Sequence, residues 1–209
     1  MRKIILLVLL CSLGWYGMGC GGGSTALAPP ESHQPPPAPK SYDHPDQEML
    51  EEALRGRHLG PKEVADLSDR LLAEGSSTFH NEQAMARLEI LITKALQSEH
   101  KEASPRLLRN LGIIHYHQRK FTLARQELQR ANEQFPRDGR THFYLARLAM
   151  HQGMALERKG QKKKAKGQFK QAATELELAR KLEASNPLYR QDLRALIQGE
   201  VPASAERKK

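Results

Sequence analysis

LLRNLGIIHYHQRKFTLARQELQRANEQFP, residues 107–136, decides the fold of this chain. Apolar and small residues recur in it at helical spacing, and small residues stand where two helices must meet. Such a helix–turn–helix unit cannot bury its own apolar face, so it needs neighbouring units, and a stack of units forms a binding groove. The residues that we expect to pack the two helices are Leu111, Gly112, Ala124, Leu128 and Ala131, with Pro136 closing the unit.

The pattern returns further along the chain. Gly112 recurs as Ala146 after 34 residues, and Ala124 recurs as Ala172 after 48 residues, which is 34 plus 14. Fourteen residues make about four helical turns, so an insertion shared by both arms of a hairpin leaves the apolar faces in phase. We therefore expect one elongated hairpin over residues 141–183, with its tip near residues 159–164.

The remaining stripes are also helical. Apolar residues recur at intervals of three and four, and the prolines stand at helix starts or beyond helix ends. Strand signals such as alternating β-branched residues and Asn-Gly turns are absent from the sequence. The sequence predicts an all-α domain over residues 46–200, with a last helix near residues 187–198 and a polar tail over residues 201–209.

The repeat resembles the tetratricopeptide repeat family, and residues 105–138 match it best. The small and apolar residues listed for the first unit fall where that family places its signature residues, although the late aromatic is displaced to Tyr116. A second unit carries Ala146, Ala172 and Ala179 with an atypical insertion, and an earlier unit over residues 62–98 is degenerate. The resemblance implies a short α-solenoid of helical hairpins.

The resemblance also implies a groove that binds a partner protein. In that family the first helix of each unit lines the concave face, so it places the partner-binding groove at Asn110, Ile113, His117, Tyr144, Arg147 and His151.

The N-terminus reads as a signal peptide over residues 1–19. A basic start is followed by a short apolar run and then by small residues, which are the three parts of a secretory signal. The run is shorter than the ~20 apolar residues that a membrane-spanning helix needs. Its end resembles the lipobox of bacterial lipoproteins, because Gly19 precedes Cys20, although Gly17 departs from that pattern.

The lipobox resemblance implies that Cys20 carries acyl chains such as palmitate and anchors the protein in the cell envelope. By family analogy, the lack of an acidic residue beside Cys20 favours the outer membrane, with the protein facing the periplasm. An ordinary cleaved signal peptide with an incidental cysteine is the alternative. Residues 20–45 hold seven of the twelve prolines and a Gly-Gly-Gly run, which predicts a flexible, disordered tether and, as an alternative, a proline-rich ligand.

The sequence lacks the patterns of an enzyme. It has no nucleophile elbow, no phosphate-binding glycine loop and no zinc protease motif, and we expect no cofactor. The nine histidines do not pair at helical metal spacing, so we expect no metal site and mostly surface histidines, with His115 partly packed. Nucleic acid is not an expected partner, because the signal peptide takes the chain away from it.

A basic run is the sharpest local feature. Seven cations crowd into thirteen residues: Arg158, Lys159, Lys162, Lys163, Lys164, Lys166 and Lys170. At the tip of a long hairpin they would form a positive projection that docks on lipid headgroups or an acidic partner. The alternative is a solvated helical turn that lysine keeps soluble.

Two functions follow from these patterns. The first is a lipid-anchored adaptor or scaffold that binds an envelope protein or peptide, for example during assembly of a pilus or secretion system. The second is a structural envelope protein that docks on the cell wall or anionic lipid through the basic run. The sequence names neither the partner nor the oligomeric state.

Overall fold

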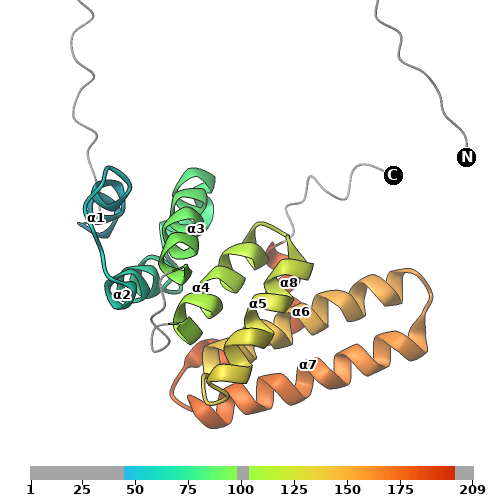
Figure 1. The fold of residues 1–209 in the computed structure, drawn as a ribbon. Helices are drawn as coiled ribbons and strands as arrows, with labels where there is room; N and C mark the ends of the chain where they lie inside the picture. The colour runs from blue at the N-terminus through green and yellow to red at the C-terminus, as the bar shows by residue number, and fades with distance from the viewer. Residues whose placement is uncertain (1–44, 98–103, 201–209) are drawn as a thin grey trace, which may run out of the picture. The chain divides into compact units, whose positions relative to one another are not determined.

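The computed structural model describes residues 45–97 and 104–200, and these belong to one compact unit (Figure 1). All regular structure in these ranges is helical, and they contain no β-strand. The predicted signal peptide, Cys20, the tether up to residue 44 and the tail over residues 201–209 lie outside the described residues. The helices are α1 (Pro45–Leu54), α2 (Pro61–Leu71), α3 (Glu82–Leu96), α4 (Ser104–His117), α5 (Phe121–Gln134), α6 (Gly139–Arg158), α7 (Lys162–Leu182) and α8 (Leu193–Glu200), with short 3-10 helices η1 (Ser77–His80) and η2 (Pro187–Arg190).

Helix starts follow local chemistry. Pro61 occupies the first turn of α2, where its missing N–H costs no helical hydrogen bond. The Asn81 side chain accepts a hydrogen bond from the Ala84 N–H at 3.0 Å and so caps α3. Pro45, the last residue of the predicted tether, is the first residue of α1.

Helices α4 and α5 form an antiparallel hairpin that closes on small residues, as predicted. A Cβ atom at Gly112 would stand 2.7 Å from Leu128 Cγ and 3.2 Å from the Ala124 carbonyl oxygen, so only glycine permits this approach. Ala124, Leu128 and Ala131 are buried, and so is Leu111. Pro136 follows the end of α5 and is exposed.

Helices α6 and α7 form the elongated hairpin, which confirms the prediction for residues 141–183, although α6 begins slightly earlier, at Gly139. Both helices are longer than α5, and the tip of the hairpin extends past it (Figure 1). Ala146, Ala172 and Ala179 are buried along the seam. The inserted residues therefore lengthen both arms without changing which faces pack.

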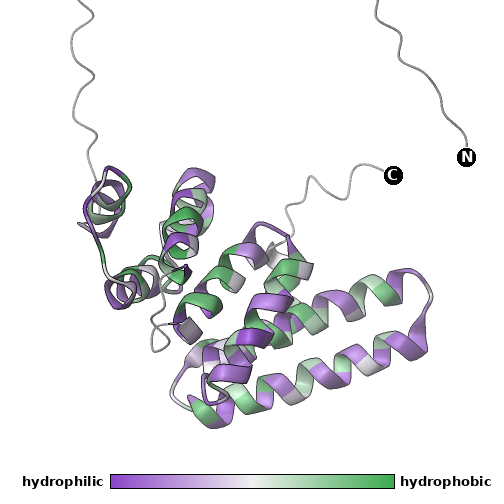
Figure 2. Ribbon diagram, viewed as in Figure 1, coloured by the Kyte–Doolittle hydropathy of each residue, from purple (hydrophilic) through white to green (hydrophobic). Residues whose placement is uncertain are grey.

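The apolar faces of the helices join in one core. Green, apolar ribbon faces turn toward neighbouring helices in Figure 2, and polar faces turn outward. Helix α4 contacts α2, α3, α5 and α6, and α6 contacts α4, α5, α7 and α8. Each of these two helices therefore contacts the two helices before it and the two helices after it.

The predicted last helix near residues 187–198 is present as α8, but it begins at Leu193 and is not continuous with the segment that starts at Pro187. The segment is divided into η2 and α8, with Gln191 extended at φ −74° and ψ 159° between them. The Asp192 side chain accepts a hydrogen bond from the Ala195 N–H at 2.7 Å and so starts α8 as a new helix. The break lets the Tyr189 ring enter the core beside Phe143, at 4.8 Å between ring centroids.

A membrane-spanning helix is not found among residues 45–97 and 104–200, since no helix there combines sufficient length with sufficient apolarity.

Candidate binding pocket

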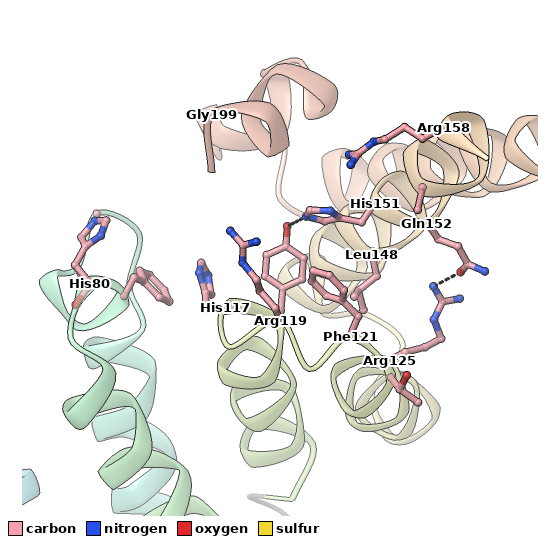
Figure 3. Close-up of a pocket in the computed structure, with 16 residues that line it drawn as sticks. His80, His117, Arg119, Phe121, Arg125, Leu148, His151, Gln152, Arg158 and Gly199 are labelled. Atoms are coloured by element: carbon pink, nitrogen blue, oxygen red, sulfur yellow. Dashed lines mark hydrogen bonds between the residues drawn. The ribbon is translucent and has the colours of Figure 1, made fainter. Parts of the chain in front are cut away.

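An open hollow of about 1190 Å³ lies beside the turn between α4 and α5 (Figure 3). Its walls come from η1, from the end of α4, from the start of α5 and from α6, with Gly199 of α8 at one edge. Residues far apart in sequence therefore build it, and two helical hairpins hold it in shape.

Aromatic rings line part of the hollow. Phe79 of η1 stacks on His117 of α4 with 4.2 Å between ring centroids. Phe121 of α5 lies 4.8 Å from the ring of His151 of α6. The Tyr116 hydroxyl and His151 Nε2 form a hydrogen bond of 3.0 Å, which joins α4 to α6 (Figure 3).

Arg147 underlies this aromatic group. Its guanidinium carbon is 4.6 Å from the Tyr116 ring centroid and 4.9 Å from that of Tyr144, in cation–π geometry. His117 Nε2 and the Tyr144 hydroxyl form a hydrogen bond of 3.2 Å. Arg147 and Tyr144 are buried, so they support the hollow rather than line it.

Two histidines of the hollow, His117 and His151, are neutral at neutral pH because their pKa values are lowered. Burial, followed by the charge of Arg147, lowers the pKa of His117 to about 3. Burial and the charges of Arg147, Arg119 and Arg158 lower the pKa of His151 to about 4. Neither imidazole adds positive charge to the site under ordinary conditions.

Positive charge comes from arginines on the walls. Arg119 stands in the α4–α5 turn, Arg125 in α5 and Arg158 at the end of α6. Arg125 Nη2 donates a hydrogen bond to Gln152 Oε1 at 2.7 Å, which joins α5 to α6 (Figure 3). None of the 16 residues that line the hollow is acidic.

The predicted groove residues divide into three groups. His117 and His151 line the hollow, and Tyr144 and Arg147 lie beneath its aromatic wall. Asn110 and Ile113 are both 0 % exposed, so neither reaches an accessible surface in this structure. Ile113 belongs to the apolar core.

Asn110 is covered because α2 packs on this face of α4. Its side-chain amide donates hydrogen bonds to Ser68 Oγ at 2.7 Å and to Asp69 Oδ1 at 2.6 Å. Arg109 Nε donates a hydrogen bond to the side-chain Oδ1 of Asn110 at 3.0 Å, and the guanidinium forms ion pairs with Asp69 and Asp138. Burial alone would raise the pKa of Asp69, but Arg109, Asn110 and Arg106 together hold that pKa below its usual value. We call Ser68, Asp69, Arg109, Asn110 and Asp138 the polar cluster.

The seven cations of the predicted basic run are all exposed at the tip of the α6–α7 hairpin. We call them the basic tip. Glu157, the nearby acidic residue, pairs with Arg194 of α8 at 2.6 Å. Within the described part of the chain, no carboxylate lies within ion-pair distance of the basic tip.

The expectation of mostly surface histidines was wrong for His142. His142 is buried, with Nδ1 2.7 Å from Glu175 Oε2 and Nε2 3.0 Å from the Pro136 carbonyl oxygen. The bond to Glu175 raises its pKa. His115 is also buried and lies 3.3 Å from Glu89. Among residues 45–97 and 104–200, no group of three or more His, Cys, Asp or Glu side chains could hold a metal ion.

Sequence reasoning did not single out Phe79, Arg119, Phe121 or Arg125 as site residues. One signal was present for Arg119. The 34-residue repeat and a seven-residue extension of one hairpin arm align Arg119 with Gly160, so an arginine stands where the second turn has glycine. Phe79 could not be found in this way, because the degenerate earlier unit over residues 62–98 gives it no equivalent.

No family model matches this chain, and no curated protein matches it.

Proposed function

We propose that this protein is a lipid-anchored adaptor of the bacterial cell envelope that binds a partner protein in the hollow. The observation that carries the proposal is the hollow itself, an accessible aromatic and cationic site that two packed hairpins hold in shape. Its size and openness suit a polypeptide segment.

The helix packing supports a short α-solenoid of tetratricopeptide type. Each hairpin packs on the next through its first helix, because α4 contacts α2 and α3 while α6 contacts α4 and α5. Helix α8 contacts α6 and covers the end of the stack, as a terminal cap does in a repeat array. Repeat arrays use such surfaces to hold other proteins.

The anchor is tested with the two cysteines of the chain. Cys20→Ala should abolish incorporation of radioactive palmitate and release the protein from washed envelopes. Cys11 lies within the apolar run of the signal, so the Cys11→Ala variant should keep both the palmitate labelling and the attachment to envelopes. Equal labelling and sedimentation of the two variants would remove the lipid anchor from the proposal.

The binding surface is tested by photo-crosslinking in intact cells. A photoreactive residue at Ala155, which is exposed and lines the hollow, should trap a discrete partner. The matched control is Ala173 of α7, another exposed alanine, which lies outside the hollow. Identical products from both positions, or none from Ala155, would contradict the adaptor function.

The basic tip favours a second function, docking on the cell wall or anionic lipid. Seven exposed cations without carboxylate partners in the described residues form a surface that attracts polyanions. Replacing Lys162, Lys163 and Lys164 by glutamine should reduce sedimentation with sacculi or anionic vesicles if this function holds.

The control for the basic tip removes the same charge elsewhere. Lys62 in α2, Lys94 in α3 and Arg137 in the turn between α5 and α6 are all exposed. Their triple replacement by glutamine lowers the net charge equally. Equal sedimentation of the two triple variants would assign the lysines to solubility alone.

A further inference from the structure

Two turns of this molecule are built alike. In the α4–α5 turn, the Arg119 N–H donates to the Tyr116 carbonyl at 3.0 Å and the Lys120 N–H donates to the His115 carbonyl at 2.8 Å. In the α6–α7 turn, the Gly160 and Gln161 N–H groups make the equivalent bonds, both of 2.9 Å. This is the Schellman pattern, in which the first residue beyond the helix C-cap, here Arg119 or Gly160, takes a left-handed backbone conformation.

The residue at the left-handed position differs between the two turns. Gly160 has φ 71° and adopts it without steric cost, whereas Arg119 has φ 61° with a Cβ atom that this conformation crowds. Among the residues that the structure describes, Arg119 is the one residue other than glycine with a positive φ. Backbone outliers of this kind concentrate at functional sites, where the strain is kept because the site needs that residue.

The Arg119 side chain faces the hollow. Figure 3 shows its guanidinium beside His117 and on the side of His151, whose Nε2 is hydrogen-bonded to the Tyr116 hydroxyl. It is exposed, and within residues 45–97 and 104–200 no carboxylate lies within ion-pair distance of it. Among the described residues, this arginine therefore has no anionic partner.

The surrounding charges share one sign. Arg125 and Arg158 stand on other walls of the hollow, and no acidic residue lines it. Arginine binds carboxylates through two parallel hydrogen bonds, so three arginines around one hollow match several carboxylates. The hollow is far larger than one inorganic anion needs, and the Phe79 and Phe121 rings offer apolar contact between the charges.

We propose that the hollow binds an acidic polypeptide segment, whose carboxylates meet Arg119, Arg125 and Arg158 and whose apolar side chains contact Phe79 and Phe121. The proposal rests on the proposed function, because it names the chemistry of the partner that the adaptor holds. Arg119 is retained in a left-handed turn because its charge is needed there.

Binding should also change the protonation of the site. The charges of Arg119 and Arg158 help to lower the pKa of His151. Carboxylates bound to these arginines would offset their charge, so the pKa of His151 rises in the complex. NMR titration of the His151 imidazole in the free and the peptide-bound protein measures this rise.

The binding test uses the full-length protein in neutral detergent and a fluorescein-labelled peptide, Glu-Glu-Phe-Glu-Glu-Phe. A peptide with glutamine in place of glutamate is the uncharged probe. The acidic peptide should bind, and Arg119→Gln should weaken its binding about tenfold, as loss of a charge-assisted contact does. Arg137→Gln, which removes an equal charge from an exposed site outside the hollow, should bind as the natural protein does.

A second variant separates strain from charge. Arg119→Gly relieves the left-handed backbone, so it should raise the melting temperature by about 2–4 °C. The same variant should lose binding to the extent that Arg119→Gln does. A variant that folds better but binds less well is the signature of a residue kept for its ligand.

Three results would overturn the proposal. They are equal binding of the acidic and glutamine peptides, equal loss in Arg119→Gln and Arg137→Gln, and unchanged binding in Arg119→Gly. Capture by phosphatidylglycerol vesicles that depends on Arg119, without binding of the acidic peptide, would assign the hollow to lipid instead. Crosslinking from Ala155 that persists in Arg119→Gln cells would leave the adaptor function standing while the acidic partner fails.

Discussion

Single atoms decide how closely α4 and α5 approach each other. At Gly112, a methyl group would meet both the Leu128 side chain and the Ala124 carbonyl oxygen, and the backbone atom cannot move aside. The α7 residue Gly167 is different, since nothing lies within 4 Å of the position of its Cβ atom. The two glycines therefore stand in helices for different reasons.

Gly112→Ala should lower the free energy of unfolding by about 1–3 kcal/mol, because the methyl group overpacks the α4–α5 seam. Gly167→Ala should instead raise it by about 0.5–1 kcal/mol, because alanine favours the helix and meets no neighbour there. Urea denaturation of both variants measures the difference. An unchanged free energy of unfolding in Gly112→Ala would show that α4 and α5 can move apart without cost.

His117 makes stability depend on pH. Its pKa is about 3 in the folded protein and about 6.5 when unfolded, so between these values only the unfolded chain binds the proton. The contribution of His117 to the free energy of unfolding is fully present above pH 6.5. It falls as the pH drops, by about 1–2 kcal/mol between pH 7 and pH 5. His117→Gln should flatten this part of the profile, measured as the difference in unfolding free energy at the two pH values.

The contribution of His142 to stability depends on pH in the opposite direction, so this residue serves as the comparison. Its folded pKa is raised by Glu175, so its contribution is complete below the unfolded pKa and disappears as the pH rises through the folded pKa. His142→Gln should therefore lose more stability at pH 5 than at pH 8. If both variants changed the profile in the same direction, the opposite environments assigned to the two rings would be incorrect.

At the scale of elements, the paired turns allow a reciprocal exchange. Gly160→Arg places in the α6–α7 turn the residue that the α4–α5 turn carries, and it should lower the free energy of unfolding by about 1–2 kcal/mol. Gln161→Arg adds the same charge at the next residue, where φ is −82°, and should leave stability nearly unchanged. Thermal and urea denaturation of the pair measure the backbone effect apart from the charge.

Most helices could be predicted because their signals are local. The spacing of Gly112, Ala124 and Ala131 depends only on which faces of two adjacent helices meet, and the 14-residue insertion preserves that phase. The break between η2 and α8 could not be predicted in this way. It depends on a place in the core for Tyr189, which residues from α6 and α7 create.

At the scale of the whole molecule, contacts between hairpins decide which residues are accessible. Asn110 and His117 share the α4 face that sequence reasoning assigned to the groove. Helix α2 covers the first and leaves the second beside the hollow. The sequence gives the face of a helix but not the extent of the neighbour that covers it, so only part of the groove could be predicted.

Asn110 also tests how far the stack unfolds as separate parts. Its bonds to Ser68 and Asp69 hold α4 against α2, and Asn110→Ala should lower stability by about 1–3 kcal/mol, because the polar partners remain buried without it. In a stack with nearest-neighbour coupling, this loss falls on α1, α2 and α3, whose amides should exchange faster, while α6 and α7 keep their protection. Hydrogen exchange measured by mass spectrometry resolves these helices. A uniform loss of protection from α1 to α8 would instead mean that the polar cluster joins all of them into one cooperative unit.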